Sequence, residues 1–201
     1  MQSASATSPR IALTPSLAIR QAATVLLGSL FVAVCAHVLV PLWFTPVPLT
    51  LQTFAVLTLG LVLSPGLSAA ALVAYLLEGM CGLPVFSPIG APSFLHLFGP
   101  TGGYLLAYPA AAALTGLLRR CLNSGRSASG GFTASLLAAT TGSALILLSG
   151  AAWLAIVTRQ SPATVFVVAV APFLPGDILK LIASAGIASG WTRFRTRSAR
   201  S

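Results

Sequence analysis

The segment "AVAPFLPGDILKLIASAG", residues 169–186, is almost entirely apolar, yet it contains Asp177 and Lys180. Lys180 is the only lysine in the sequence, and Asp177 is one of only two acidic residues, the other being Glu78. Charged side chains inside a membrane-spanning segment are costly, and they usually have a function. The segment therefore predicts a membrane helix with a functional pair of charges.

The composition of the whole chain supports a membrane location. Of the 201 residues, 56% are hydrophobic and only 6% are charged, whereas about a quarter of the residues in a soluble domain are charged. Long apolar runs recur along the full length, which is typical of an integral membrane protein. The net charge of +9 does not indicate nucleic-acid binding, because the basic residues lie at the ends of apolar segments and form no aromatic-interleaved patch.

Six apolar segments are interpreted as membrane spans, the second of them short, so we expect an all-α integral membrane protein, a compact bundle of six transmembrane helices. The expected spans are about 16–40, 51–63, 67–80, 102–118, 132–157 and 163–191. Pro172, Pro175 and Gly176 are expected to interrupt the last one. The bundle, 16–191, would lie between a disordered cytoplasmic N-terminus, 1–15, and a basic cytoplasmic tail, 192–201.

The arginines test this count of spans. With six spans, nine of the ten arginines fall on one side of the membrane, and only Arg159 falls on the other. The excess of basic residues in cytoplasmic loops then predicts that both termini are cytoplasmic, with the tail close to anionic lipid. Two Pro- and Gly-rich connections, 41–53 and 81–103, would face outward and fold back like re-entrant loops, as a lid or a lining.

Asp177 and Lys180 are three residues apart, so on a helix they share a face. Together they offer two acceptor oxygens and three donor hydrogens, which suits a neutral polar ligand with adjacent N–H and C=O groups. Two structural alternatives are an internal ion pair and a role of Asp177 as the N-cap of a half-helix. Gln52, after Thr50 at the start of the second span, is either a ligand contact or a tie between helices.

Other motifs do not indicate catalysis. The sequence contains no paired carboxylates, no nucleophile elbow and no metal-ligand cluster, so we expect no enzyme activity, metal or cofactor. "GPTGG" is not a P-loop, and ATP would have to be bound by another subunit. His37 and His96 are expected to be structural, and the three cysteines are expected to be small buried hydrophobic residues. Glu78 would pair with Lys180 or lie at the membrane interface.

Four stretches in sequence order, between residues 45 and 188, resemble the BioY family: "TPVPLTLQT", "LLEGMCGLPVFSPIG", "FGPTGGYLLAYPAAAALTGLL" and "PFLPGDILKLIASAGIA". BioY proteins are the biotin-binding S components of energy-coupling factor (ECF) transporters. The resemblance implies a six-helix bundle in a bacterial inner or plasma membrane, with an outward-facing site that binds biotin with high affinity. It also implies two kinds of partner, a membrane T component and two ATP-binding-cassette ATPases.

The resemblance implies a biotin site that consists of Asp177, Lys180, Gln52, Thr50, Phe86 and Tyr104. Asp177 would accept hydrogen bonds from the urea N–H groups of biotin, and Lys180 would donate to an oxygen. Phe86 and Tyr104 would pack against the ring. The partner of the biotin carboxylate is left open among backbone amides, Gln52 and His96.

Ser29 and Ala33 form a small-xxx-small pattern, which allows helices to approach closely. The pattern matches the place where S components dock onto the T component. The alternatives to a biotin-binding subunit are an S component for another vitamin and an ion-coupled secondary carrier that uses Asp177 as a proton site.

Overall fold

The computed structural model describes residues 15–89, 94–123 and 131–198. The predicted N-terminal segment, 1–15, therefore lies almost wholly outside the described residues. The helices of the described part are α1 (Pro15–His37), α2 (Gln52–Val62), α3 (Pro65–Met80), α4 (Leu95–Phe98), α5 (Gly102–Asn123), α6 (Gly131–Thr158), α7 (Pro162–Ala169) and α8 (Leu174–Ser198).

Each of the six predicted segments is helical, which confirms the predicted all-helical membrane fold. The sixth segment consists of α7, the short 3₁₀ helix η2 (Ala171–Phe173) and α8. By length and apolar composition, α1, α6 and the segment Pro162–Thr192 could each cross a membrane. α2 has 11 residues, about half of the roughly 20 that a helix needs to cross the hydrocarbon. The chain is a multi-pass membrane protein in which α2 is too short to span alone.

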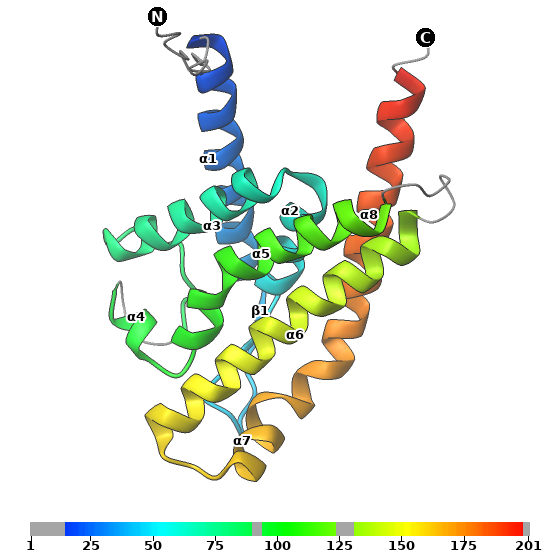
Figure 1. Cartoon of the computed structure of the whole chain (residues 1–201). Coiled ribbons are helices and arrows are strands. Elements are labelled where there is room, and N and C mark those ends of the chain that lie inside the picture. The colour runs from blue at the N-terminus through cyan, green and yellow to red at the C-terminus, as the bar shows by residue number, and fades with distance from the viewer. Residues whose placement is uncertain (1–14, 90–93, 124–130, 199–201) are drawn as a thin grey trace, which may run out of the picture.

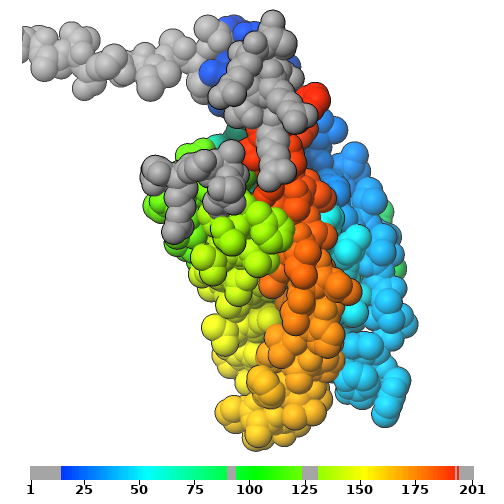
Figure 2. All heavy atoms as spheres, turned by 90° about the vertical axis from the view of Figure 1, so that its right-hand side faces the viewer, coloured from blue at the N-terminus to red at the C-terminus, as the bar shows by residue number. Residues whose placement is uncertain are grey.

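α2 is the central helix of the bundle. It contacts α1, α3, α5, α6 and α8, and eight of its eleven residues are buried. An apolar helix that is buried on all sides belongs in a protein interior. α5 runs along α6, and the start of α1 lies at the same end of the molecule as the end of α8 (Figure 1). In Figure 2, α8 runs down the face between α6 on one side and the blue-to-cyan segment of α1 and the first loop on the other.

Glycines allow α2 and α5 to approach closely. A Cβ atom at Gly60 of α2 would lie 2.7 Å from the carbonyl oxygen of Ala112 on α5. A Cβ atom at Gly116 of α5 would lie 2.9 Å from the carbonyl oxygen of Gly60. Neither contact is sterically possible, so any larger residue at either position would push the two helices apart.

The connection between α1 and α2 differs from the prediction. α1 ends at His37, before the predicted end at residue 40, and Leu39–Val40 (β1) pairs antiparallel with Leu49–Thr50 (β2). In this register Leu39 lies opposite Thr50. Three prolines in the segment 41–48 cannot donate helical hydrogen bonds, so the chain turns back as a ribbon instead of extending α1. The second long connection, 81–103, also contains an unpredicted helix, α4.

The predicted interruption of the last segment is present, but it is centred earlier. The chain leaves the helical conformation at Val170, with φ −126° and ψ −61°, and Pro172 lies in η2. Pro175 lies in the first turn of α8, where a missing N–H has no cost. Asp177 also belongs to this first turn, so it lies inside α8 and is not its N-cap.

Candidate functional site

A pocket lies where the β-ribbon, the start of α2, the start of α5 and the α7–α8 junction meet. We call it the central pocket, and it encloses about 510 Å³ of space between atoms, its mouth included. It is lined by Val47, Pro48, Thr50, Gln52, Thr53, Ser87, His96, Thr101, Tyr104, Leu105, Tyr108, Leu147, Phe173, Asp177 and Lys180. Five of the six residues predicted for the ligand site are in this lining, and Phe86 is the exception.

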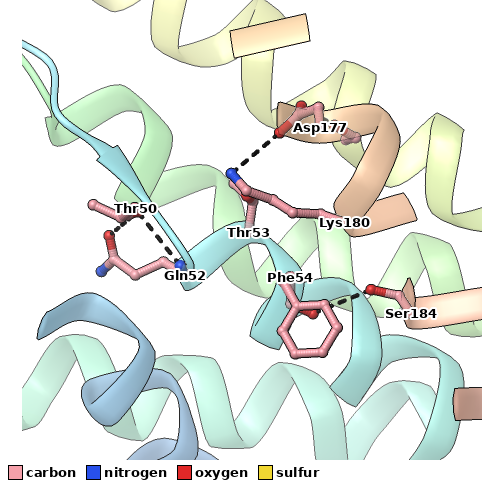
Figure 3. A network of polar contacts seen from close by, with 8 residues as sticks. Thr50, Gln52, Thr53, Phe54, Asp177, Lys180 and Ser184 are labelled. Carbon is pink, nitrogen blue, oxygen red and sulfur yellow. Dashed lines mark hydrogen bonds and ion pairs between the residues drawn. The ribbon is translucent and has the colours of Figure 1, made fainter. Parts of the chain in front are cut away.

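The charged pair forms one wall of the central pocket. The Nζ atom of Lys180 lies 3.4 Å from Oδ1 of Asp177, and it donates a hydrogen bond to Oγ1 of Thr53 at 2.9 Å (Figure 3). Ser143 of α6 donates to the other carboxylate oxygen, Oδ2 of Asp177, at 2.7 Å. Asp177 is only 5% exposed. The pair is therefore an internal ion pair that also borders a cavity, so the two predicted roles are compatible.

Gln52 ties three elements together. Its Nε2 atom donates to the hydroxyl of Tyr75 on α3 at 2.6 Å, and its Oε1 atom accepts from Thr50 of β2 at 3.0 Å. Figure 3 shows Thr50 and Gln52 side by side at the entry to α2. The structure thus shows that Gln52 is a tie between helices. Its position in the lining keeps a ligand contact possible for the same side chain.

Aromatic rings form another part of the lining. Tyr104 of α5 donates its hydroxyl to the carbonyl oxygen of Ala169 at 2.8 Å, and its ring centroid lies 6.4 Å from that of Phe173. Its ring packs against Gly150 of α6, where a Cβ atom would lie 2.2 Å from a ring carbon. Tyr104 therefore joins α5 to the α7–α8 junction and fixes the shape of the pocket.

Phe86 does not line the central pocket. Its ring packs edge-on against Tyr75 at a centroid distance of 5.4 Å, and the ring of His96 lies at the same centroid distance. Its position depends on Gly79, where a Cβ atom would overlap the Phe86 ring. Phe86 thus packs beside His96, which lines the pocket and is 4% exposed, and a contact between Phe86 and a ligand stays a prediction.

Sequence reasoning missed several polar residues of this site, among them Ser143, Thr53 and Tyr108. Tyr108 could have been found, because it follows Tyr104 by one helical turn and both face the pocket. Ser143 gave no local signal, since it lies 34 residues before Asp177 and is one of several serines and threonines in α6. Only the packing of α6 on α8 brings the two together.

The predicted docking residues lie inside the bundle. Ser29 is 0% exposed and Ala33 is 6% exposed, where α1 packs on α3. Ser29 donates a hydrogen bond to Oε2 of Glu78, so Glu78 pairs with α1 and not with Lys180. A partner could reach Ser29 or Ala33 only if α1 and α3 moved apart, and docking at these two residues stays a prediction.

The cysteines fit their prediction only in part. Cys35 is buried, as a small hydrophobic residue would be, but Cys81 and Cys121 are exposed. Both exposed residues lie at helix ends, Cys81 directly after α3 and Cys121 in the last turn of α5. Hence burial does not explain these two cysteines.

Comparisons with known proteins point to one family. The model of the BioY family matches residues 5–197. A protein of Pyrococcus horikoshii named "Probable biotin transporter BioY" is 37% identical over 135 residues, which cover 67% of this chain and 74% of that protein. A "Biotin transporter BioY" of Rhizobium etli is 34% identical over 165 residues, or 81% and 87% of the two chains. A crystal structure described as the S-component for biotin from an ECF-type ABC transporter superposes with a TM-score of 0.80, with 23% identity over 90% of this chain and 95% of that one.

Proposed function

The chain belongs to the BioY family, and from this premise we propose that it is the biotin-binding S component of an ECF-type transporter. A member of this family is a transport protein and not an enzyme. The relatives with the same family name are biotin transporters, and the superposed structure shares the fold.

The observation that carries the proposal is the Asp177–Lys180 pair in the wall of a largely apolar pocket. Biotin combines a cyclic urea, which has two N–H donors and one C=O acceptor, with an apolar thioether ring. Asp177 would accept from the urea N–H groups, and Lys180 would donate to an oxygen of the ligand. Leu105, Leu147 and Phe173 would contact the ring, as apolar side chains usually do in ligand pockets.

The site would be selective because its polar groups are buried. When a ligand lacks the group that would pair with a buried carboxylate, the loss of binding free energy is larger than the loss from one missing apolar contact. An analogue without the urea N–H groups would leave Asp177 with only Ser143 and Lys180 as partners. The loop between β1 and β2 contributes Val47 and Pro48 to the lining. By covering the pocket, this loop would exclude water from these contacts.

The proposed partners are a T component and two ATP-binding-cassette ATPases, since the chain contains no P-loop of its own. The proposed orientation in the bacterial inner or plasma membrane places both termini in the cytoplasm. The common end of α1 and α8 and the arginines near it support this orientation (Figure 1). Docking through Ser29 and Ala33 stays a prediction, and it requires α1 to separate from α3.

Calorimetric titration of the detergent-purified protein with biotin tests the proposal. The intact protein should bind tightly, and Asp177→Asn and Lys180→Ala should each lower the affinity by about 100-fold or more, the effect expected for a buried charged contact. The matched control is Arg159→Gln, because Arg159 is exposed and does not line the pocket. Absence of binding by the intact, folded protein would refute the biotin assignment. Unchanged affinity in both pocket variants would assign the pair a structural role only.

A further inference from the structure

A second hollow lies at the other end of the helices that form the central pocket. It is lined by Leu61, Val62, Leu63, Ser64, Gly116, Arg119, Arg120, Asn123 and Thr192. We call it the arginine hollow. Within the described residues it shares no lining residue with the central pocket, although α2, α5 and α8 contribute to both. Along α8, Lys180 and Thr192 are about 18 Å apart, and along α5, Tyr108 and Gly116 are about 12 Å apart, so the two hollows are separate sites on the same helices.

The guanidinium group of Arg119 is held by neutral oxygen atoms. Its Nε atom donates to Oγ of Ser135 at 3.0 Å, its Nη2 atom donates to the carbonyl oxygen of Ala188 at 3.2 Å, and its Nη1 atom donates to the carbonyl oxygen of Leu61. Arg119 thereby joins α2, α5, α6 and α8 at this end of the bundle. The side chain is half-buried, and Arg120 beside it is exposed.

No acidic side chain of the chain neutralises these two arginines. The sequence has only two acidic residues, and both are engaged elsewhere, Asp177 with Lys180 and Glu78 with Ser29. A partly buried charge without a counter-charge is unfavourable, because it has lost hydration and gained no ion pair. The arginine hollow is therefore complementary to an anion that no acidic side chain of this chain supplies.

The surroundings of the hollow indicate the kind of anion. Leu61, Val62 and Leu63 place apolar surface next to the two guanidinium groups. Trp191, directly before the lining residue Thr192, is 48% exposed, and Phe194 is 66% exposed. Exposed aromatic side chains at a helix end are typical of the membrane interface, where lipid headgroups lie.

We propose that the arginine hollow binds the phosphate headgroup of an anionic phospholipid from the leaflet next to the chain termini. The planar guanidinium group of arginine can donate two parallel hydrogen bonds to two oxygens of one phosphate. Asn123 adds a polar side chain to the same wall. The apolar part of the hollow would contact the glycerol and the first acyl carbons. Basic pockets between transmembrane helices bind anionic headgroups in this way. This inference does not depend on the identity of the ligand in the central pocket.

Native mass spectrometry of the whole chain, delipidated and then exposed to equal amounts of phosphatidylglycerol and phosphatidylcholine, tests the proposal. The intact protein should retain phosphatidylglycerol preferentially, and Arg120→Gln should weaken this retention about 10-fold, as expected for one charge-assisted contact. Arg120 is the better test position, because its side chain is exposed. Arg119, by contrast, donates a hydrogen bond to the last turn of α2, and its loss would destabilise the bundle. The matched control is Arg159→Gln, which removes an exposed arginine away from the hollow and should retain the lipid.

Three results would overturn the proposal. One is equal retention of phosphatidylglycerol by the intact protein, Arg120→Gln and Arg119→Lys, with all three monodisperse in gel filtration. Another is thermal stabilisation by inorganic phosphate, lost in Arg120→Gln, without preferential retention of phosphatidylglycerol, which would assign the hollow to a soluble anion. The third is unchanged lipid retention by Arg120→Gln together with a weaker association with the other transporter subunits, which would assign the arginines to a protein partner.

Discussion

The two hollows at opposite ends of α2, α5 and α8 differ in the net charge of their linings. In the central pocket, one carboxylate and one ammonium group lie 3.4 Å apart, so the wall is neutral although it is ionic. In the arginine hollow, two guanidinium groups share a wall without an acidic side chain. A neutral wall with separate donors and acceptors suits a neutral polar group such as a urea, whereas an uncompensated positive wall suits an anion.

The difference also concerns the cost of removing one group. The carboxylate of Asp177 is buried and has both of its oxygens occupied, by Ser143 and by Lys180. Arg120, by contrast, is exposed to the surroundings of the helix end. Substitutions in the central pocket should therefore affect both stability and binding, and substitutions at the rim of the arginine hollow should affect binding alone.

The largest effect is expected when only one member of the charged pair is removed. Lys180→Met leaves the carboxylate of Asp177, 5% exposed, without its cation, and should lower the free energy of unfolding by about 3 kcal/mol. The double variant Asp177→Asn/Lys180→Met removes both charges and should regain most of this stability. Thermal unfolding in detergent measures both effects, and biotin titration should show that neither variant binds tightly.

A Lys180→Met variant as stable as the intact protein would show that the pair contributes no stability. The double variant then serves as the control, because it shares the changed volume at position 180. The double variant could instead be less stable than Lys180→Met. Removal of the Asp177 carboxylate would then be the destabilising step, and the claim that the two charges neutralise each other in the pocket wall would be wrong.

A smaller effect is expected from a methyl group added against the aromatic wall. In Gly150→Ala the new Cβ atom would lie 2.2 Å from the ring of Tyr104, so the ring must move and its hydrogen bond to Ala169 must lengthen. We expect a loss of about 2 kcal/mol of stability, as for other overpacked cores, together with weaker biotin binding. The matched control is Gly186→Ala in α8, where nothing lies within 4 Å of the added atom. Equal melting temperatures of the two variants would contradict the tight contact.

The elements that the sequence predicted well are those with a local cause. Long apolar runs marked the six helical segments, and the i, i+3 spacing of Asp177 and Lys180 placed both on one face of α8. The β-ribbon and α4 were missed because elements of two to four residues have no periodicity to detect. Their positions are set by the helices on which they pack.

The site was predicted in part for the same reason. Thr50 and Gln52, which are close to a motif, were found, whereas Ser143 contacts Asp177 only because α6 packs on α8. Phe86 was placed in the pocket because its stretch of sequence is part of the resemblance. The stretch does not fix the direction of a side chain, and the ring packs against Tyr75 and His96 outside the pocket lining.

A still smaller effect, on biotin binding, is expected from Ser143→Ala. The substitution removes the donor at 2.7 Å from Oδ2 of Asp177 and leaves Lys180 in place. A hydrogen bond to a charged group contributes about 1.5–3 kcal/mol, so biotin affinity should fall about 10-fold or more. Ser189→Ala is the matched control, because its hydroxyl donates only to the carbonyl oxygen of Ala185 within α8. A loss of affinity in both serine variants would point to a general loosening of the helices instead of a role for the Ser143 hydroxyl.

The smallest effect is expected from Arg120→Gln on biotin affinity. Arg120 is about 18 Å along α5 from Tyr108 of the central pocket, and sites this far apart usually act independently, so the affinity should change less than twofold. α2, α5 and α8 nevertheless connect the two hollows, and by linkage any effect of the lipid on biotin must equal the effect of biotin on the lipid. Titration of the intact protein and Arg120→Gln with biotin, each with and without phosphatidylglycerol, measures this coupling directly. A change of fivefold or more that appears only when the lipid is present would show that the shared helices transmit the occupancy of one hollow to the other, and the two ends would then have to be treated as one coupled system.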